Sequence, residues 1–177
     1  MGRKTLPNNL KNRNEQRVRG NQIAGKDKAG RRQAPLVFYL VALVVVVADQ
    51  LTKLLIQANL ALGQSVPVGP ICITYLTNTG SLFGLFPNQT IFLIITAAIG
   101  VAAVVVYYRY LPSKTLLVRA GLGLLLGGAV GNLTDRLRFG YVIDFIDLRV
   151  WPVFNLADSA VTVGIVLLGW FILFRWK

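Results

Sequence analysis

Apolar residues fall into four long runs that are separated by shorter polar segments. The runs cover residues 36–56, 91–108, 116–133 and 154–174, and none of them contains proline. A helix needs about 20 consecutive apolar residues to cross the hydrocarbon core of a bilayer, and each run has about that length. The pattern predicts an all-α membrane protein that is built as a bundle of four transmembrane helices.

Positive charge is concentrated before the first run. More than half of the 19 Lys and Arg residues precede position 33, whereas residues 57–90 contain none. Four spans place both termini on the same side, and the positive-inside rule predicts that this side is the cytoplasm. We therefore predict a basic, disordered cytoplasmic tail at residues 1–34 and a four-helix integral membrane domain at residues 35–177.

The segment between the first two runs has a different pattern. Residues 66–76 read VPVGPICITYL, in which β-branched residues flank Gly69 and Pro70. This pattern is typical of short strands joined by a turn, although an irregular loop is an equally good interpretation of the propensities alone. We predict a small extracytoplasmic β-like substructure between helices 1 and 2.

Composition narrows the classes of function. The chain is 54% hydrophobic, and its formal charge of +12 comes mainly from the tail, which favours contact with anionic lipid over nucleic-acid binding. There is one cysteine and no histidine, so the usual nitrogen and sulfur ligands of a zinc site are missing. We expect neither a metal nor a cofactor.

Acidic residues interrupt this oily chain at few places. Of the seven Asp and Glu residues, four lie within residues 127–159: Asp135, Asp144, Asp147 and Asp158. Carboxylates are costly near lipid and mark functional sites by default. Counting along the spans places Asp135 and Asp158, together with Asp49 and Asn132, at a similar depth near the outer surface. This convergence predicts a single polar site.

Several of these polar residues have structural interpretations. Asp49 and Lys53 lie one helical turn apart, so they can form an ion pair with Lys53 reaching outward, or they can position a substrate. Asn132 begins a polar cap on the third span, in which we expect Asp135 to pair with Arg136.

The loop residues in the same region are less constrained. Asn78 and Gly80 are typical of a turn before the second span. Asp147 has Arg149 two residues away, and we expect it to be solvated beside that arginine.

Asp144 and Asp158 differ from the other acids because neither has a basic residue near it in the sequence. Two unpaired acids at one depth would repel if both were ionised, so one should hold a proton. Aspartic proteases use this arrangement to activate water. The alternative is a proton or cation path in a small membrane transporter.

Motifs at each polar interruption together resemble lipoprotein signal peptidase, the type II signal peptidase of bacteria. The resemblance extends over residues 36–174, and its motifs are DQLTK at 49–53, NTGSLFGLF at 78–86, GGAVGNLTDR at 127–136, GYVIDFID at 140–147 and FNLADS at 154–159. Ser81 and Thr134 stand where a small apolar and an aliphatic residue are expected. Neither bears directly on Asp144 or Asp158.

The resemblance implies a membrane-embedded aspartic endopeptidase with Asp144 and Asp158 as its catalytic pair. It would remove the signal peptide from diacylglyceryl-modified prolipoproteins, cleaving just before the lipidated cysteine. Its partners would be these substrates and membrane lipids. We expect a multi-pass protein of the bacterial cytoplasmic membrane with its active site near the extracytoplasmic face. Supporting or substrate-facing roles would fall to Asp49, Lys53, Asn78, Gly80, Asn132, Asp135, Arg136 and Asn155.

Overall fold

The long apolar runs form helices, and the polar segments between them form strands and turns. The structure is a computed structural model that describes residues 36–80, 90–110 and 115–175. The predicted tail at residues 1–34, as well as Ser81, lies outside the described residues. The elements, in chain order, are a first helix at Leu36–Asn59, β1 at Ser65–Val68, β2 at Ile71–Asn78, α2 at Thr90–Tyr110, α3 at Leu116–Phe139, β3 at Val142–Asp147 and α4 at Leu156–Arg175.

All four predicted spans are confirmed as helices that are long and apolar enough to cross a membrane. The third span is longer than predicted, since α3 continues beyond residue 133 to Phe139. The Thr115 hydroxyl accepts a hydrogen bond from the Val118 amide at the start of α3, and Gly140 ends the helix in the left-handed conformation with a φ of 81°. Asp135 and Arg136 therefore lie in a helix and not in an outer loop.

The strands form one antiparallel sheet with the order β1-β2-β3. The predicted hairpin is confirmed, because β1 pairs with β2 around the turn at Gly69 and Pro70, with Val68 opposite Ile71. The prediction that the substructure lies between helices 1 and 2 is incomplete, since β3 comes from the segment between α3 and α4. Pairing of Asn78 with Val142 joins this distant segment to β2.

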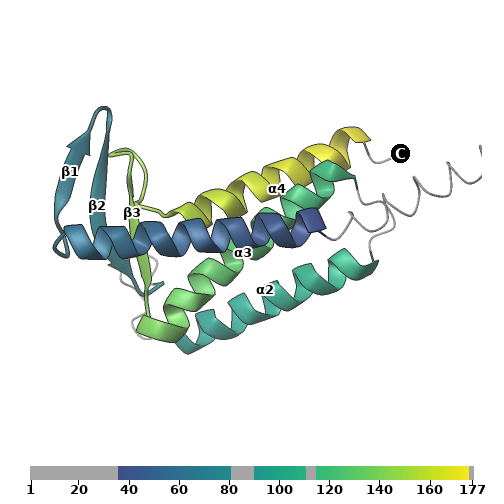
Figure 1. The fold of residues 1–177 in the computed structure, drawn as a ribbon, viewed down its shortest axis with the longest axis horizontal. Coiled ribbons are helices and arrows are strands. Elements are labelled where there is room, and N and C mark those ends of the chain that lie inside the picture. Colours follow the sequence, from purple (N-terminus) through teal and green to yellow (C-terminus); the bar gives the residue numbers. More distant parts are fainter. Residues whose placement is uncertain (1–35, 81–89, 111–114, 176–177) are drawn as a thin grey trace, which may run out of the picture. The chain divides into compact units, whose positions relative to one another are not determined.

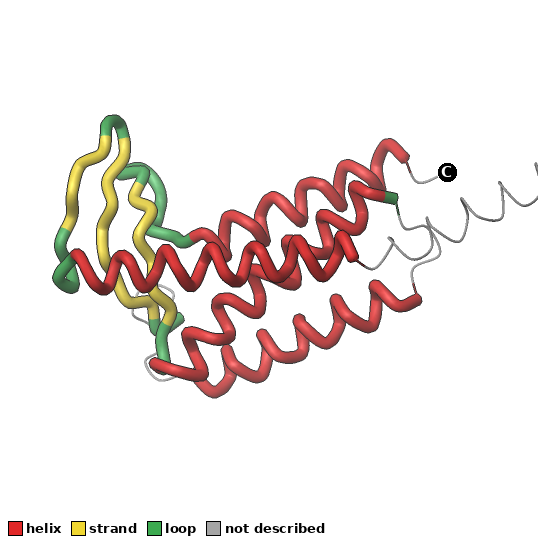
Figure 2. The backbone as a smooth tube through the Cα atoms, in the orientation of Figure 1, coloured by secondary structure: helices red, strands yellow, loops and turns green. Residues whose placement is uncertain are grey.

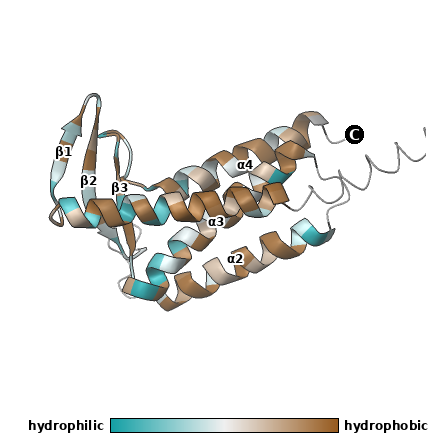
Figure 3. Ribbon diagram, viewed as in Figure 1, coloured by the Kyte–Doolittle hydropathy of each residue, from teal (hydrophilic) through white to brown (hydrophobic). Residues whose placement is uncertain are grey.

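The sheet lies at one end of the helices, and the first helix begins and α4 ends at the other end (Figure 1). The tube in Figure 2 shows that the three strands cross the ends of the helices and do not run along them. The most extensive helix contacts are between α3 and α4, and α2 packs on α3. Figure 3 shows mainly hydrophobic helices, with hydrophilic positions near the sheet on the first helix and at the end of α3.

Small residues let α3 approach the first helix closely. Gly123, Gly127 and Gly131 recur every fourth position, so they share one face of α3. A Cβ atom added at Gly127 would lie 2.7 Å from the backbone oxygen of Ala42, and one at Gly123 would lie 2.8 Å from that of Phe38. Such stripes allow backbones to meet where lipid offers no hydrophobic driving force.

Candidate active site

Polar side chains from five elements meet at the sheet end of the bundle. The first helix, β2, α3, β3 and the start of α4 each contribute to one hydrogen-bonded network, whose members are Asp49, Lys53, Asn78, Asn132, Asp135, Asp144, Asn155 and Asp158. The convergence predicted from span order is confirmed. The roles assigned to these residues stay predictions.

Asp144 lies in the middle of β3 and is buried, with 3% of its surface exposed. One carboxylate oxygen accepts a hydrogen bond from the side-chain amide of Asn78 at 2.9 Å, and the other accepts one from the side-chain amide of Asn155 at 2.7 Å. Burial raises the pKa of the Asp144 carboxyl to about 6. The hydrogen bond from Asn78 opposes this rise in pKa, and the negative charge of Asp158 adds to it.

Asp158 lies in the first turn of α4, and Asn155 caps that helix. The backbone amide of Asp158 donates to the side-chain oxygen of Asn155 at 2.9 Å. In return, the backbone amide of Asn155 donates to the Asp158 carboxylate at 3.2 Å. This reciprocal pair is a capping box, and it fixes the Asp158 side chain to the helix start. The second Asp158 oxygen accepts from the side-chain amide of Asn132 at 2.8 Å.

Asn155 therefore joins the two acids that the sequence singled out. Its side-chain nitrogen contacts Asp144, and its backbone nitrogen contacts Asp158. Among the residues that the structure describes, neither acid forms an ion pair with Lys or Arg. Both carboxylates are held by neutral amide donors and not by a direct ion pair among these residues.

Lys53 organises the other half of the network. Its ammonium lies 2.8 Å from Asp49 and 2.7 Å from Asp135, and it donates to the side-chain oxygen of Asn132 at 3.1 Å. The ion pair with Asp49 is confirmed, but the prediction that Lys53 reaches outward is wrong, since its side chain is 2% exposed. A buried ammonium is stable only with such partners, and here two carboxylates and one amide surround it.

Asp49 and Asp135 use their remaining oxygen lone pairs to hold neighbouring elements. Asp49 accepts from the backbone amide of Ala157 at 3.0 Å, which ties the first helix to the start of α4. Asp135 accepts from the backbone amide of Ile143 at 3.2 Å, next to Asp144. A side chain at position 131 would displace Asp49, because a Cβ added to Gly131 would lie 2.7 Å from its carboxylate.

The predicted ion pair between Asp135 and Arg136 is wrong. Adjacent residues on a helix point to different sides, and Asp135 turns toward Lys53. The Nε atom of Arg136 is buried and has no hydrogen-bond partner in the described part of the chain. The guanidinium charge interacts electrostatically with Asp158, Asp144 and Asp135.

Asn78 and Gly80 form a turn, as predicted. The side-chain oxygen of Asn78 accepts from the backbone amide of Gly80 at 2.8 Å, and Gly80 has a φ of 80°. This turn orients the Asn78 amide, whose nitrogen contacts Asp144. The positive φ favours glycine at position 80, and a Cβ atom there would also meet the flexible end of the Leu93 side chain in α2.

Asp147 is not a member of this network, and its predicted position beside Arg149 is confirmed. It accepts a hydrogen bond from the backbone amide of Arg149 at 2.8 Å and lies 3.7 Å from the guanidinium. The backbone hydrogen bond is the main cause that lowers the pKa of the Asp147 carboxyl. Its side chain is partly shielded, because the Thr74 hydroxyl also donates to it at 3.0 Å.

Sequence reasoning missed Gln50. Its side-chain amide donates to Asp135 at 2.8 Å, to Asp49 at 3.2 Å and to the backbone oxygen of Gly131 at 3.3 Å. Gln50 therefore links the two carboxylates that flank Lys53. The sequence did contain a signal for Gln50, because it is an amide residue that directly follows Asp49 within a mainly apolar run.

Known proteins resemble this chain over most of its length. The family described as Signal peptidase (SPase) II matches residues 41–174. The lipoprotein signal peptidase of Moorella thermoacetica is 48% identical over 75% of this chain and 90% of its own length. That of Pelotomaculum thermopropionicum is 44% identical over 78% of this chain and 92% of its own length.

Two solved structures, each described as a bacterial membrane enzyme studied by the in meso method, share the fold. They are 34% and 33% identical to this chain, with TM-scores of 0.72 and 0.73. The alignments cover 77% and 78% of this chain and 87% and 94% of theirs. None of these matches supports the transporter alternative. Because the family match spans most of the chain and its relatives are covered over most of their length, the chain belongs to the signal peptidase II family.

Proposed function

We propose that Asp144 and Asp158 are the catalytic pair with which this aspartic peptidase cleaves the signal peptide from prolipoproteins, just before a diacylglyceryl-modified cysteine. The observation that carries the proposal is the bridge through Asn155, which holds two unpaired carboxylates in one network. Only these two of the acids in the network lack an ionic partner among the described residues.

The two acids have different surroundings, which suit them to different tasks. Burial raises the pKa of Asp144, so Asp144 holds the shared proton. Asp158 lies in the first turn of α4, where the helix dipole favours a negative charge. Asp158 is therefore the base in this scheme and Asp144 is the acid.

Hydrolysis then proceeds without a covalent intermediate. Asp158 removes a proton from a water molecule whose oxygen attacks the scissile carbonyl carbon, while Asp144 donates its proton to the carbonyl oxygen. The resulting tetrahedral diol collapses when Asp158 returns its proton to the leaving amine and Asp144 recovers one from a diol hydroxyl. The carbon–nitrogen bond breaks, and both acids regain their starting states.

The surrounding residues position these groups. Lys53 holds Asn132, which donates to Asp158, and it also holds Asp135, which fixes the backbone before Asp144. Asp49 secures the start of α4. We assign Arg136 to the substrate side, because its buried Nε has no partner in the described residues and its charge interacts electrostatically with both acids.

The proposal includes an orientation in the bacterial cytoplasmic membrane. The basic tail at residues 1–34 would lie in the cytoplasm, and the sheet end with its active site would face the extracytoplasmic side. Support comes from the absence of Lys and Arg in residues 57–90, which adjoin the site. Membrane lipids would contact the exposed apolar side chains of the four helices.

A cleavage assay with purified protein tests this function. The substrate is a diacylglyceryl-modified prolipoprotein, and the matched control is the same polypeptide without lipid. We expect cleavage of the lipidated form alone, in the presence of a chelator, and no ion flux when the protein is placed in liposomes. Equal cleavage of both forms, or flux that disappears in Asp144→Asn, would contradict the proposal.

A further inference from the structure

A pocket of about 430 Å³ opens beside Asp158. It is formed by the first two turns of α4 and the segment that precedes them. Its walls are the apolar side chains of Leu148, Trp151, Phe154 and Val163, and its polar lining consists of Asp158, Ser159 and Thr162. This volume is within the range of small-molecule binding sites.

The two hydroxyl groups in the lining are already engaged. Ser159 donates to the backbone oxygen of Asn155 at 3.0 Å, and Thr162 donates to that of Asp158 at 2.9 Å. Neither hydroxyl proton is therefore available to a ligand, and no Lys or Arg is among the described residues that line the pocket. A phosphate group would find no cation here and would face the Asp158 carboxylate, whereas a hydrocarbon chain needs no polar partner.

The pocket is open toward lipid. Val163 is 49% exposed on α4, which is long and apolar enough to span the membrane, and Trp151 is 68% exposed on the segment before it. Tryptophan is enriched at the boundary between hydrocarbon and water, where an acyl chain would enter from the bilayer. Asp158 also lines the pocket, so an occupant that enters from the lipid would reach one carboxylate of the proposed catalytic pair.

We propose that this pocket binds an acyl chain of the diacylglyceryl group on the substrate cysteine, and that Val163 and Thr162 contact the part of a long chain that extends beyond Asp158. This inference rests on the proposed function, because the lipid is attached to the residue at the scissile bond. The thioether-linked glycerol then lies nearest the catalytic pair, and its chain leads away along α4.

Substitution of Val163 by tryptophan fills the pocket at an exposed position outside the catalytic network. Val166→Trp is the matched control, because Val166 is an exposed valine on the same helix and does not line the pocket. Each enzyme is given two substrates with the same peptide, one with palmitoyl chains and one with hexanoyl chains. We expect Val163→Trp to raise the KM ratio of long-chain to short-chain substrate at least tenfold, and Val166→Trp to leave it unchanged.

The outcomes separate this inference from the proposed function. If the wild-type protein cleaves both substrates and Val163→Trp does not change their ratio, the pocket is not the acyl site, although the peptidase assignment stands. A change in preference for the side chain before the cysteine, with no change in the chain-length ratio, would assign the pocket to the signal peptide and overturn the inference. Failure of the wild-type protein to cleave either substrate would overturn both.

A second measurement does not depend on turnover. A substrate with a photoreactive diazirine on the acyl chain near the glycerol is bound to the Asp144→Asn variant and irradiated. We expect the label on residues 148–163, and Val163→Trp should reduce it. A label confined to α2 would contradict the assignment.

Discussion

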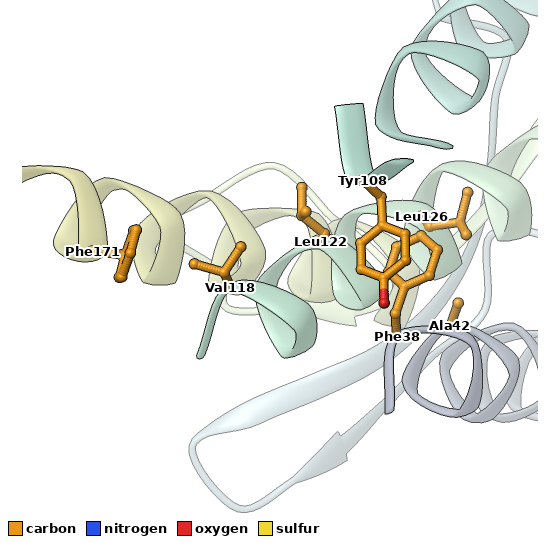
Figure 4. Close-up of a cluster of buried hydrophobic side chains, with 7 residues drawn as sticks. All are labelled: Phe38, Ala42, Tyr108, Val118, Leu122, Leu126 and Phe171. Carbon is orange, nitrogen blue, oxygen red and sulfur yellow. The ribbon is translucent and has the colours of Figure 1, made fainter. Parts of the chain in front are cut away.

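The two buried regions of the bundle are built on different physical principles. At the sheet end, charged and amide side chains from distant parts of the chain are joined by directional hydrogen bonds. At the other end, Phe38, Ala42, Tyr108, Val118, Leu122, Leu126 and Phe171 form an apolar cluster (Figure 4). Within this cluster the aromatic rings of Phe38 and Tyr108 stack, with their centroids 3.9 Å apart. The apolar cluster stabilises the packing of the helices, whereas the polar network also contains groups that can donate and accept protons.

This contrast makes the two regions respond differently to substitution. In the polar network, removal of one partner leaves a buried group unpaired, which costs more than the interaction itself contributed. In the apolar cluster, removal of a side chain leaves a cavity, and the cost is that of lost contacts. Substitutions in the polar network should therefore cost more than substitutions in the apolar cluster.

Loss of either catalytic carboxylate should have the largest effect. We expect Asp144→Asn and Asp158→Asn each to lower kcat at least about 10³-fold, because neither variant can complete the proton transfers. Both should remain folded, since an amide preserves the shape and can keep one hydrogen bond. Asp147→Asn, on the same strand, is the matched control and should retain activity. Processing of a lipidated substrate at the wild-type rate by either variant would remove that residue from the pair.

Loss of Lys53 should have the largest effect on stability. Lys53→Met leaves the buried carboxylates of Asp49 and Asp135 facing each other without a cation, and we expect it to lower the free energy of unfolding by about 3–5 kcal/mol. Unfolding in detergent micelles measures this change. Adding Asp135→Asn should restore part of the loss, because it removes one of the two charges. If Lys53→Met unfolds like the wild type, the ammonium does not organise the network.

Phe38→Ala in the apolar cluster should cost less. Lipid is as apolar as the cluster, so the cavity supplies most of the penalty, about 2 kcal/mol in the free energy of unfolding. The folded fraction should cleave substrate with unchanged kcat. Leu40→Ala, at an exposed position on the same helix, is the control and should have little effect. A loss of kcat without a loss of stability would show that the two regions are not separate.

The smallest effect is expected for Gln50. Gln50→Leu removes donors to Asp135 and Gly131 while Lys53 still pairs with Asp135, so the expected loss is about 1 kcal/mol in the free energy of unfolding. Gln57→Leu is the control on the same helix. Among the described residues, the only hydrogen bond of the Gln57 side chain is a long one to the Tyr75 hydroxyl at 3.4 Å. Equal effects of both changes would remove Gln50 from the network.

Local sequence pattern predicted the helices well and the sheet in part. The four spans follow from apolar runs, but the last turns of α3 were missed because Asp135 and the arginines that follow it interrupt the hydropathy pattern. Asp135 is charged because it pairs with Lys53 and not because the helix ends there. Strand β3 could not be predicted, since VIDFID is a short apolar segment whose strand character depends on pairing with β2 far away in the sequence.

Most residues of the polar network were predicted, with Gln50 missed, but of their pairing only the ion pair of Asp49 with Lys53 was predicted. Depth along each span brought Asp49, Asn132, Asp135 and Asp158 together. It does not say which way a side chain turns around the helix, so Asp135 was assigned to Arg136 when its partner is Lys53. The bridging role of Asn155 likewise depends on the capping geometry of α4, which appears only in three dimensions.

In the proposed mechanism Asp144 holds the proton of the pair, and the pH dependence of kcat/KM in Asn78→Ala tests this protonation state. In the wild type we expect kcat/KM to fall as the pH rises above about 6, where Asp144 loses its proton. The Asn78 hydrogen bond lowers the pKa of Asp144, so its removal should raise that pKa and move this alkaline limb to higher pH. An alkaline limb that stays in place or moves to lower pH in Asn78→Ala would contradict the account.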